Sequence, residues 1–451
     1  MTASFATRPP RVDIPPDVWH GSGQLAPYIA RIAVEHGPIF TFAPEMGPLA
    51  GRDVVYMVGP EANRCVLSTH RDCVSHEVGW TPVMGETLGR GLLNMDPPEH
   101  TRHRDMMNPA FTAQFMARYL PLMRRTIETR TADWTERGEV DLLAEAREIT
   151  FDVAAEALVG FHTGPEVDFL RQSFSTLFNS RVEEDETWEQ ASQRLLGVRA
   201  ALQTKLLELI TERRQDASSE RTDDVLGLMV RAHDGQGQSL TDEQLLAHVN
   251  ILLVAGHETT TTLGAWLLYL LATHPDYTAR ITAELAATLG APDVPITTEA
   301  LRGLPVLTNA IREAGRIQSP VMMVPRGVVR DFAFGGYTVT AGTAMFLAIA
   351  ACHRLPTVFA SPDTFDPDRF APPREEDKRT PYGLVTFGGG PRICIGVNFA
   401  QVELKALAAH VLRRYRLTAI PDRPIVQYGG IIQSLPDGIH VRVEAARPGG
   451  K

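Results

Sequence analysis

Hydrophobic residues recur at three- and four-residue steps through the middle of the chain, and this spacing predicts helices there. The pattern is helical almost throughout residues 97–309, most clearly at 120–134, 195–210 and 245–271. Polar breaks at 216–223 and 234–237 interrupt it, and we interpret them as loops between helices. Thr241-Asp-Glu-Gln244 has the pattern of a capping box, so a long helix is predicted to begin there.

Shorter apolar runs on either side of this region predict strands. Ile39–Phe42 and Val54–Val58 come before the turn signal at Gly59-Pro60, and residues 321–329 and 336–347 follow the helical region. A Pro- and charge-rich meander at 356–378, a last helix at 397–412 and a hairpin region at 425–443 complete the pattern. Helices dominate, so we predict one mainly α domain.

Composition and charge narrow the class of protein. With 451 residues and 44% hydrophobic residues the chain can bury a large core, and its net charge of −10 argues against a nucleic-acid partner. Four cysteines are too few for a disulfide scaffold and fit a reducing cytoplasm, although a bridge between Cys65 and Cys73 stays open. Neither the first residues nor the apolar stretch around His257 and Glu258 predicts a membrane segment, so we expect a soluble, cytoplasmic protein.

The strongest chemical signal is the loop from Phe387 to Gly396, which reads F-x-x-G-x-R-x-C-x-G. Gly390 and Gly396 lack a Cβ, so they can adopt positive φ and bring the backbone close to a flat cofactor. Cys394 precedes a helix, whose N-terminus favours a thiolate, and a thiolate is a ligand for haem iron. Alone, such a cysteine would more often be a small buried hydrophobe in an ordinary turn. The whole pattern resembles the haem-binding loop of the cytochrome P-450 family.

A second motif lies in the middle of the long helix, at Ala255-Gly-His-Glu-Thr-Thr260. Small residues there let a ligand approach, and Gly256 weakens the helix locally. The segment resembles the family's oxygen-activating motif, which implies that Glu258 and Thr259 deliver protons. A polar seam of back-bonding threonines is the structural alternative. His257 points about 100° away from Glu258 on an ideal helix, so we interpret it as structural or surface.

Two further motifs match in the family's order. Glu313-Ala-Gly-Arg316 resembles the family's E-x-x-R, with Arg369 as the third member of a structural network, although the family often has leucine at Gly315. Asp96-Pro-Pro-Glu-His-Thr-Arg-His-Arg104 resembles the family's propionate-binding helix start. The resemblance covers nearly the whole chain and implies haem b between the long central helix and the cysteine loop. Cys394 would ligate the iron. The expected haem-binding residues are His100, Arg104, Ala255, Gly256, Arg326, Phe387, Gly388, Arg392 and Gly396.

The resemblance also implies one haem domain over residues 1–451. In it, 1–95 is a β-rich portion with a substrate loop, 96–316 is helical, and 317–451 holds hairpins, meander, cysteine loop and last helix. A pocket above the haem would be mostly apolar and would suit a terpenoid, steroid or fatty acyl chain, unless these residues simply fill core. The expected pocket residues are Trp80, Val83, Met84, Leu88, Asn250, Leu253, Val254, Val321, Met322, Met323, Ile431 and Ile432.

The resemblance as a whole implies a monomeric monooxygenase that inserts one atom of O₂ into such a substrate. No dinucleotide fingerprint follows a strand, so NAD(P)H electrons would arrive through a separate ferredoxin-type protein. Arg102, Lys405, Arg413 and Arg414 are candidates for a basic docking patch.

Two alternatives are weighed against this function. A peroxide-using peroxygenase is disfavoured because such relatives tend to lose the acid–alcohol pair. A non-catalytic haem sensor is also disfavoured. It would need no proton relay and would gain from an attached output domain, and the sequence meets neither condition.

Overall fold

The computed structural model describes residues 8–19, 23–44, 49–162, 164–179, 187–215 and 224–446. The predicted loop at 216–223 lies outside these residues. The longer helices are α2 (Leu25–His36), α7 (Ala113–Thr131), α9 (Leu142–Val159), α10 (Pro165–Asn179), α11 (Trp188–Gln215), α13 (Asp242–Thr273), α14 (Pro275–Leu289), α16 (Pro305–Ile317) and α19 (Val397–Arg414). The shorter helices are α1 (Pro16–Trp19), α3 (Pro60–Arg64), α4 (His76–Trp80), α5 (Glu86–Leu88), α6 (Glu99–Met107), α8 (Trp134–Arg137), α12 (Val225–Arg231), α15 (Thr298–Arg302), α17 (Ile349–Cys352) and α18 (Glu376–Arg379).

The strands are β1 (Ile39–Phe42), β2 (Val54–Met57), β3 (Val74–Ser75), β4 (Glu139–Asp141), β5 (Val324–Val328), β6 (Phe332–Phe334), β7 (Tyr337–Val339), β8 (Ala344–Leu347), β9 (Tyr415–Ala419) and β10 (His440–Ala445). The largest sheet has the order β1-β2-β8-β5-β3, and its only parallel pair is β2 with β8 in the part of the chain that the structure describes. It therefore joins the N-terminal portion to the region after α16. The mainly α prediction is confirmed, but the portion before Asp96 also holds α1 to α5, so it is mixed and not β-rich.

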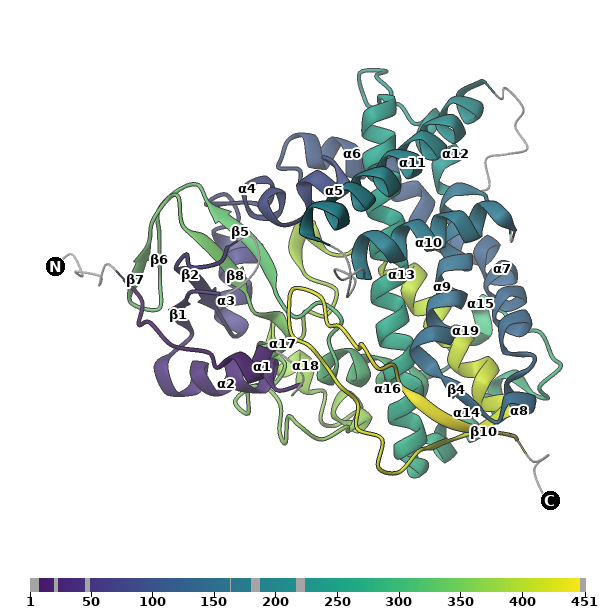
Figure 1. The fold of residues 1–451 in the computed structure, drawn as a ribbon. Helices are drawn as coiled ribbons and strands as arrows, with labels where there is room; N and C mark the ends of the chain where they lie inside the picture. The colour runs from purple at the N-terminus through teal and green to yellow at the C-terminus, as the bar shows by residue number, and fades with distance from the viewer. Residues whose placement is uncertain are drawn as a thin grey trace.

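The long helix α13 is the axis of the helical part and passes beside α9 and α19, as Figure 1 shows. Its predicted capping box is confirmed: Thr241 Oγ1 accepts from Gln244 N–H at 3.3 Å, and Gln244 Oε1 accepts from Thr241 N–H at 3.0 Å. Apolar residues are buried on all its faces, as expected of a helix surrounded by others. Gly264 allows close packing on α19, because a Cβ there would lie 3.2 Å from Leu407 Cδ2.

The C-terminal hairpin predicted at 425–443 is wrong in its pairing. The antiparallel partners of β10 are β9 and β4, and within 425–439 only the isolated bridge from Tyr428 to Ser434 forms among the described residues. Gly429 and Gly430 directly follow Tyr428 and supply no side chains that could stabilise a longer ladder. The segment is instead fixed by distant contacts, which local patterning does not reveal.

Candidate active site

The loop that carries Cys394 is a closed turn before α19. Phe387 O accepts from Cys394 N–H at 2.8 Å. Gly388 and Gly390 have φ of +74° and +60°, and a Cβ at Gly390 would lie 2.4 Å from Leu67 O, so only glycine fits there. The prediction of positive φ is confirmed for Gly390 but wrong for Gly396, whose φ is −85°. A Cβ at Gly396 would lie 3.9 Å from Cys394 Sγ, so this glycine keeps the space beside the sulfur open.

Cys394 has an exposed side chain, yet burial among the surrounding protein raises the pKa of its thiol. The exposed side chain and the pKa raised by burial agree if the exposed surface of Cys394 faces a space inside the protein and not the bulk solvent. The Gly396 N–H and the Arg104 charge lower the same pKa but do not outweigh burial. The helix begins at Val397, as predicted, but its N-terminal end does not outweigh burial, so the expected preference for a thiolate is not seen in the protein alone. A metal cation at the sulfur would supply the missing stabilisation.

Ala255 marks an open space beside α13. It is exposed, whereas Val254 and His257 next to it on the same helix are buried. The helix is continuous through Gly256, and a Cβ at Gly256 would meet only Leu158 Cδ1, at 3.6 Å. A small side chain exposed on an otherwise surrounded helix leaves room for a flat group against the backbone.

The acid and the alcohol of the second motif lie next to this space. Thr259 Oγ1 donates to Ala255 O, one helical turn earlier, at 2.7 Å. This is the bond expected for the structural alternative, a polar seam of threonines bonded to their own helix. Glu258 Oε1 lies 3.2 Å from His257 Nε2 and 3.7 Å from Arg147 Nε of α9. The interpretation that His257 points away from Glu258 is wrong, because the imidazole is buried against Phe151 and its Nε2 turns to the carboxylate.

A group of basic side chains, here called the cation cluster, gathers where β5, α4, α6 and the cysteine loop meet. Its members are His76, His100, Arg104, Arg326 and Arg392. Burial and the neighbouring arginines lower the pKa of His100 to about 4 and hold that of His76 well below its usual range. The same two causes lower the pKa of Arg326 to about 9, chiefly through burial. The positive charges therefore destabilise one another.

Within the described residues, Asp96 is the carboxylate that His100, Arg326 and Arg392 share, and Arg104 has Asp105 beside it. Asp96 lies 3.7 Å from Arg392 and also accepts from the backbone N–H of His76 at 2.8 Å. Arg326 is 4% exposed, its Nε has no hydrogen-bond partner in the described part of the chain, and one Nη donates to Pro325 O at 2.7 Å. Buried charges are tolerated when opposite charges pair with them. The buried cations here outnumber the carboxylates near them, so this cluster lacks negative charge.

A haem would fit these residues. Its two carboxylates would supply the charge that the cation cluster lacks, and arginine forks suit carboxylates. Cys394 Sγ would hold its iron, and Ala255 and Gly256 would leave room for it beside α13. Within the described part of the chain, no three His, Cys, Asp or Glu side chains gather as a separate metal site would need.

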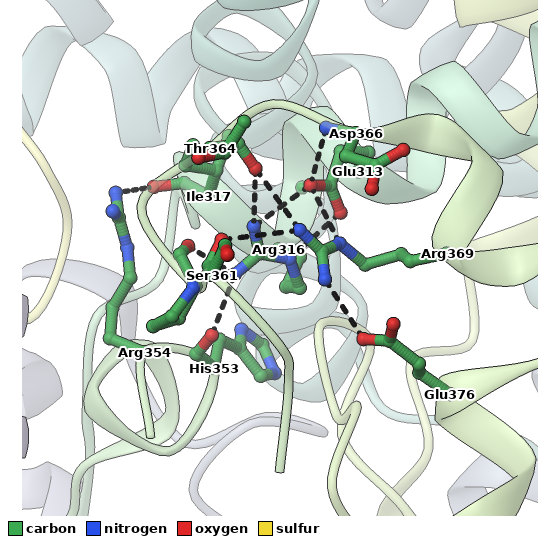
Figure 2. Close-up of polar contacts among 12 residues, drawn as sticks. Glu313, Arg316, Ile317, His353, Arg354, Ser361, Thr364, Asp366, Arg369 and Glu376 are labelled. Atoms are coloured by element: carbon green, nitrogen blue, oxygen red, sulfur yellow. Dashed lines mark hydrogen bonds and ion pairs between the residues drawn. The ribbon is translucent and has the colours of Figure 1, made fainter. Parts of the chain in front are cut away.

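The E-x-x-R motif builds a fully paired network, shown in Figure 2. Glu313 receives Arg316 Nε at 2.7 Å and Arg369 Nε at 2.9 Å, and all three side chains are 0% exposed. Arg369 also donates to Glu376 at 2.8 Å, and the remaining arginine N–H groups bind carbonyls of residues 353–364. This network, which we call the paired network, fastens the meander to α16.

His353 extends the paired network towards the cysteine loop. Its carbonyl accepts from Arg316 at 2.7 Å, and its Nε2 accepts from the backbone N–H of Val385 at 3.0 Å, two residues before Phe387. Gly315 lies against the same region, since a Cβ there would be 3.0 Å from Thr386 Cγ2. The family often has leucine at this position, but here the side chain of Thr386 occupies the space that a larger residue at 315 would need.

The expected pocket residues divide into two groups. Leu253, Met322 and Met323 are 0%, 4% and 2% exposed and belong to the core, so they have little surface to offer a ligand. Trp80, Leu88, Asn250 and Val254 are also buried, and Asn250 Oδ1 has no partner among the described residues. The half-buried members are Val83, Met84, Val321, Ile431 and Ile432.

Two segments of this second group are joined directly. Val321 pairs with Ile432, and Met322 N–H donates to Ile431 O at 2.8 Å. Trp266 Nε1 of α13 donates to Gln433 Oε1 at 2.6 Å, which ties the turn at 431–433 to the central helix.

The basic docking patch is not supported as expected. Arg413 is 8% exposed and donates to Val294 O at 3.3 Å, and Lys405 donates to Leu301 O at 3.0 Å. Arg102 is paired with Asp234 at 2.5 Å, and Arg414 with Glu128 at 3.5 Å. These side chains mainly satisfy carbonyls and carboxylates of neighbouring helices and loops.

Several residues at the site escaped the sequence analysis. Asp96 begins a recognised motif, so its position carried a signal, but His76, Arg147 and His353 stand in no pattern that marks them. They become visible only through contacts with segments that lie from 20 to more than a hundred residues away in the sequence.

The chain resembles known proteins over most of its length. The sequence model described as "Cytochrome P450" matches residues 17–433. The chain is 32% identical to "Putative cytochrome P450 136" of Mycobacterium tuberculosis over 80% of this chain and 74% of that protein. It is 28% identical to "Sterol 14alpha-demethylase" of Mycolicibacterium vanbaalenii over 81% and 82% of the two chains. The solved structure "Retinoic acid bound cyanobacterial CYP120A1" superposes with a TM-score of 0.84 at 26% identity, covering 98% of this chain and 100% of that chain.

Proposed function

This chain belongs to the cytochrome P450 family and is a haem-thiolate monooxygenase, and on that premise we propose that it oxidises a hydrophobic terpenoid, steroid or fatty acyl substrate. The proposal includes haem b, one haem domain spanning the chain, and electrons from NAD(P)H through a separate ferredoxin-type protein. No helix in the described ranges is long and apolar enough to cross a bilayer.

The observation that carries the substrate class is the apolar character of the half-buried members of the expected pocket. Val321, Ile431 and Ile432 form one joined wall, and Met84 adds a flexible side chain. The names of two relatives support the same class, since one includes retinoic acid and the other a sterol.

Each polar residue of the site has a proposed role. Cys394 holds the iron, and the cation cluster binds the haem carboxylates. The haem, when bound, supplies the activation of O₂. Thr259 Oγ1 relays protons: its hydroxyl donates to Ala255 O at 2.7 Å, so it must rotate away before it can donate elsewhere. Glu258 supplies protons after its carboxylate leaves His257 and Arg147.

A titration of the purified ferric protein tests the substrate class. Retinoic acid, a steroid and a fatty acid are added separately while the visible spectrum is recorded. A saturable spin-state change with one of them supports the proposal. A haem–thiolate spectrum that none of the three perturbs would contradict the hydrophobic class.

The proton relay is tested by coupling. With a surrogate ferredoxin and its reductase, Thr259→Ala should consume electrons with little product, because the relay hydroxyl is gone. Thr262→Ala is the matched control, since Thr262 Oγ1 is back-bonded in the same way, to Glu258 O at 3.0 Å. Equal coupling in both variants would contradict the assignment of Thr259.

A further inference from the structure

Two buried histidines join α6 to α13 and have no role in the chemistry described above. His103 Nδ1 lies 2.8 Å from His248 Nε2, and the ring centroids are 5.0 Å apart. Both side chains are 0% exposed, although 145 positions separate them in the sequence. Burying two imidazoles against each other needs a compensating set of hydrogen bonds.

The contacts fix the direction of these bonds. The backbone N–H of Leu92 can only donate, and it lies 3.3 Å from His248 Nδ1, so that nitrogen accepts. Neutral His248 then carries its proton on Nε2 and donates to His103 Nδ1. His103 in turn carries its proton on Nε2, which faces Glu99 Oε1 at 3.9 Å. The result is a directed chain from Leu92 through both rings towards α6.

This chain rests on a hydrogen bond and not on a metal. The facing nitrogens lie at hydrogen-bond distance, and in the described ranges no third metal-ligating side chain joins them. Arg102 Nη1 approaches His103 Nε2 to 3.4 Å, but both nitrogens are donors, and Arg102 is paired with Asp234.

The segment that His248 holds, Gly89–Asp96, connects the two sides of the site. Two of its carbonyl oxygens, Leu92 O and Met95 O, accept hydrogen bonds from Arg392 of the cysteine loop, the first at 3.3 Å. Internally, Asn94 binds Gly91 N–H at 2.8 Å and Gly89 O at 3.0 Å. The segment therefore has its own rigid turn, one attachment to the cysteine loop and one side-chain attachment to α13.

The segment lies tightly on α13 at the same place. A Cβ at Gly91 would be 2.6 Å from Ile251 Cδ1, and one at Gly89 would be 3.2 Å from Ala247 Cβ. Leu88 just before it and Leu92 within it are buried in the main core. An apolar residue in place of His248 could fill the same volume but could not accept the Leu92 N–H.

We propose that His248, oriented by His103, is a positioning residue that fixes the Gly89–Asp96 segment against α13 and so determines how tightly the substrate pocket closes. The inference rests on the proposed function, because it takes the space beside α13 as the pocket. Neither histidine touches substrate or haem. His103 sets the tautomer of His248, and His248 sets the position of the segment.

Hydrogen exchange of the holoenzyme tests the attachment. His248→Phe keeps the ring volume but removes the acceptor, so the Leu92 amide should exchange about tenfold faster than in the wild type. His248→Gln offers a carbonyl oxygen to the same N–H and should restore most of the protection. His410→Phe is the matched control, since His410 is also buried, lies on α19 and has a hydrogen bond to Thr131 Oγ1 at 2.9 Å. It should leave Leu92 unchanged.

Ligand release provides the second readout. With 4-phenylimidazole as the haem-binding probe, His248→Phe should release the probe about tenfold faster, by the loss of one buried hydrogen bond, while keeping the thiolate-type spectrum. Wild-type exchange at Leu92 and wild-type release in His248→Phe would overturn the proposal, as would equal effects in His410→Phe. If His248→Phe does not fold, His103→Leu replaces it, with the same change expected at Leu92.

The two proposals fail in different ways. A wild-type protein without a thiolate–haem spectrum would contradict the proposed function, while exchange at Leu92 would still decide whether the histidines fix the segment. A normal spectrum with unchanged exchange would contradict only the histidine proposal.

Discussion

The paired network and the cation cluster both bury arginines, and they differ in where the opposite charge comes from. Arg316 and Arg369 meet Glu313 and Glu376 at 2.7–2.9 Å and use their other N–H groups on carbonyls. Among the described residues, the five basic side chains of the cation cluster have two carboxylates, Asp96, which His100, Arg326 and Arg392 share, and Asp105 beside Arg104. A balanced set of buried charges indicates structure, and an unbalanced set indicates a ligand that supplies the remainder.

The largest expected effect comes from breaking the paired network. Glu313→Ala leaves two buried guanidinium groups without their shared carboxylate, so we expect a loss of about 3–5 kcal/mol in unfolding free energy, measured by denaturant titration. The chain offers a matched control in Glu299→Ala, because Glu299 and Arg302 have the same spacing but are 90% and 65% exposed and 3.9 Å apart. That change should cost less than about 0.5 kcal/mol. Similar losses in the two variants would contradict the account.

The cation cluster should respond in the opposite way in the apoprotein. Arg326→Met removes one of several mutually repelling charges, so the apoprotein should keep or gain stability in thermal unfolding. The holoprotein should lose haem about 10- to 100-fold faster, as expected for a lost charged hydrogen bond of about 1.5–3 kcal/mol. Haem transfer to an apoglobin measures this rate. A strongly destabilised apoprotein would show that Arg326 is structural.

The pH dependence of stability separates the two regions further. His100 has a pKa of about 4 in the folded apoprotein, below the ordinary value of 6.5, because of burial and then of Arg392 and Arg104. Between these values the unfolded chain holds a proton that the folded chain does not. Acidification below about pH 6.5 therefore favours unfolding, by at most on the order of 3 kcal/mol near pH 4.

Haem binding should change the pH dependence of stability that comes from His100 and leave unchanged the part that comes from His353. The haem carboxylates would raise the pKa of His100. We therefore compare the pH dependence of unfolding free energy in the wild type and in His100→Asn, and we expect the two to differ less in the holoprotein than in the apoprotein. Burial and Arg316 lower the pKa of His353 to about 3. His353 belongs to the paired network, so its titration should be the same with and without haem. NMR titration of the two imidazoles measures both. An unchanged His100 titration after haem binding would count against the cluster as the carboxylate site.

The smallest effect is expected at the rim of the paired network. Arg280 binds both carboxylate oxygens of Asp368 at 2.7 Å, but the two side chains are 48% and 40% exposed. Solvent screens this pair, so Arg280→Ala should cost less than about 1 kcal/mol in unfolding free energy. A loss as large as that of Glu313→Ala would show that geometry, and not burial, decides the contribution.

The same contrast explains how much the sequence could predict. The loop around Cys394, the capping box at Thr241 and the Glu313–Arg316 pair are local patterns, and their positions were predicted. Spacing alone does not identify a buried pair, since Glu299 and Arg302 share it and lie on the surface. Burial depends on which segments fold over the pair, as Arg369 and the meander do for Glu313.

Contacts between distant segments account for the errors. His76 and His248 gain their surroundings from partners far along the chain, and no local pattern marks them. The side chain of His257 approaches Glu258 because neighbouring helices confine it, which ideal helix angles do not capture. The partners of β10 come from β4 and β9, so the local hairpin prediction failed. The pKa of Cys394 follows burial more than helix position.

The most direct test of the central claim is the absorption spectrum of the purified, reduced protein under carbon monoxide. If the cation cluster binds haem carboxylates and Cys394 holds the iron, the wild type should show the red-shifted Soret band of a thiolate–haem complex. Cys394→His should lose that band while still binding haem. A wild-type protein that binds no haem, or a thiolate-type band that persists in Cys394→His, would contradict the account.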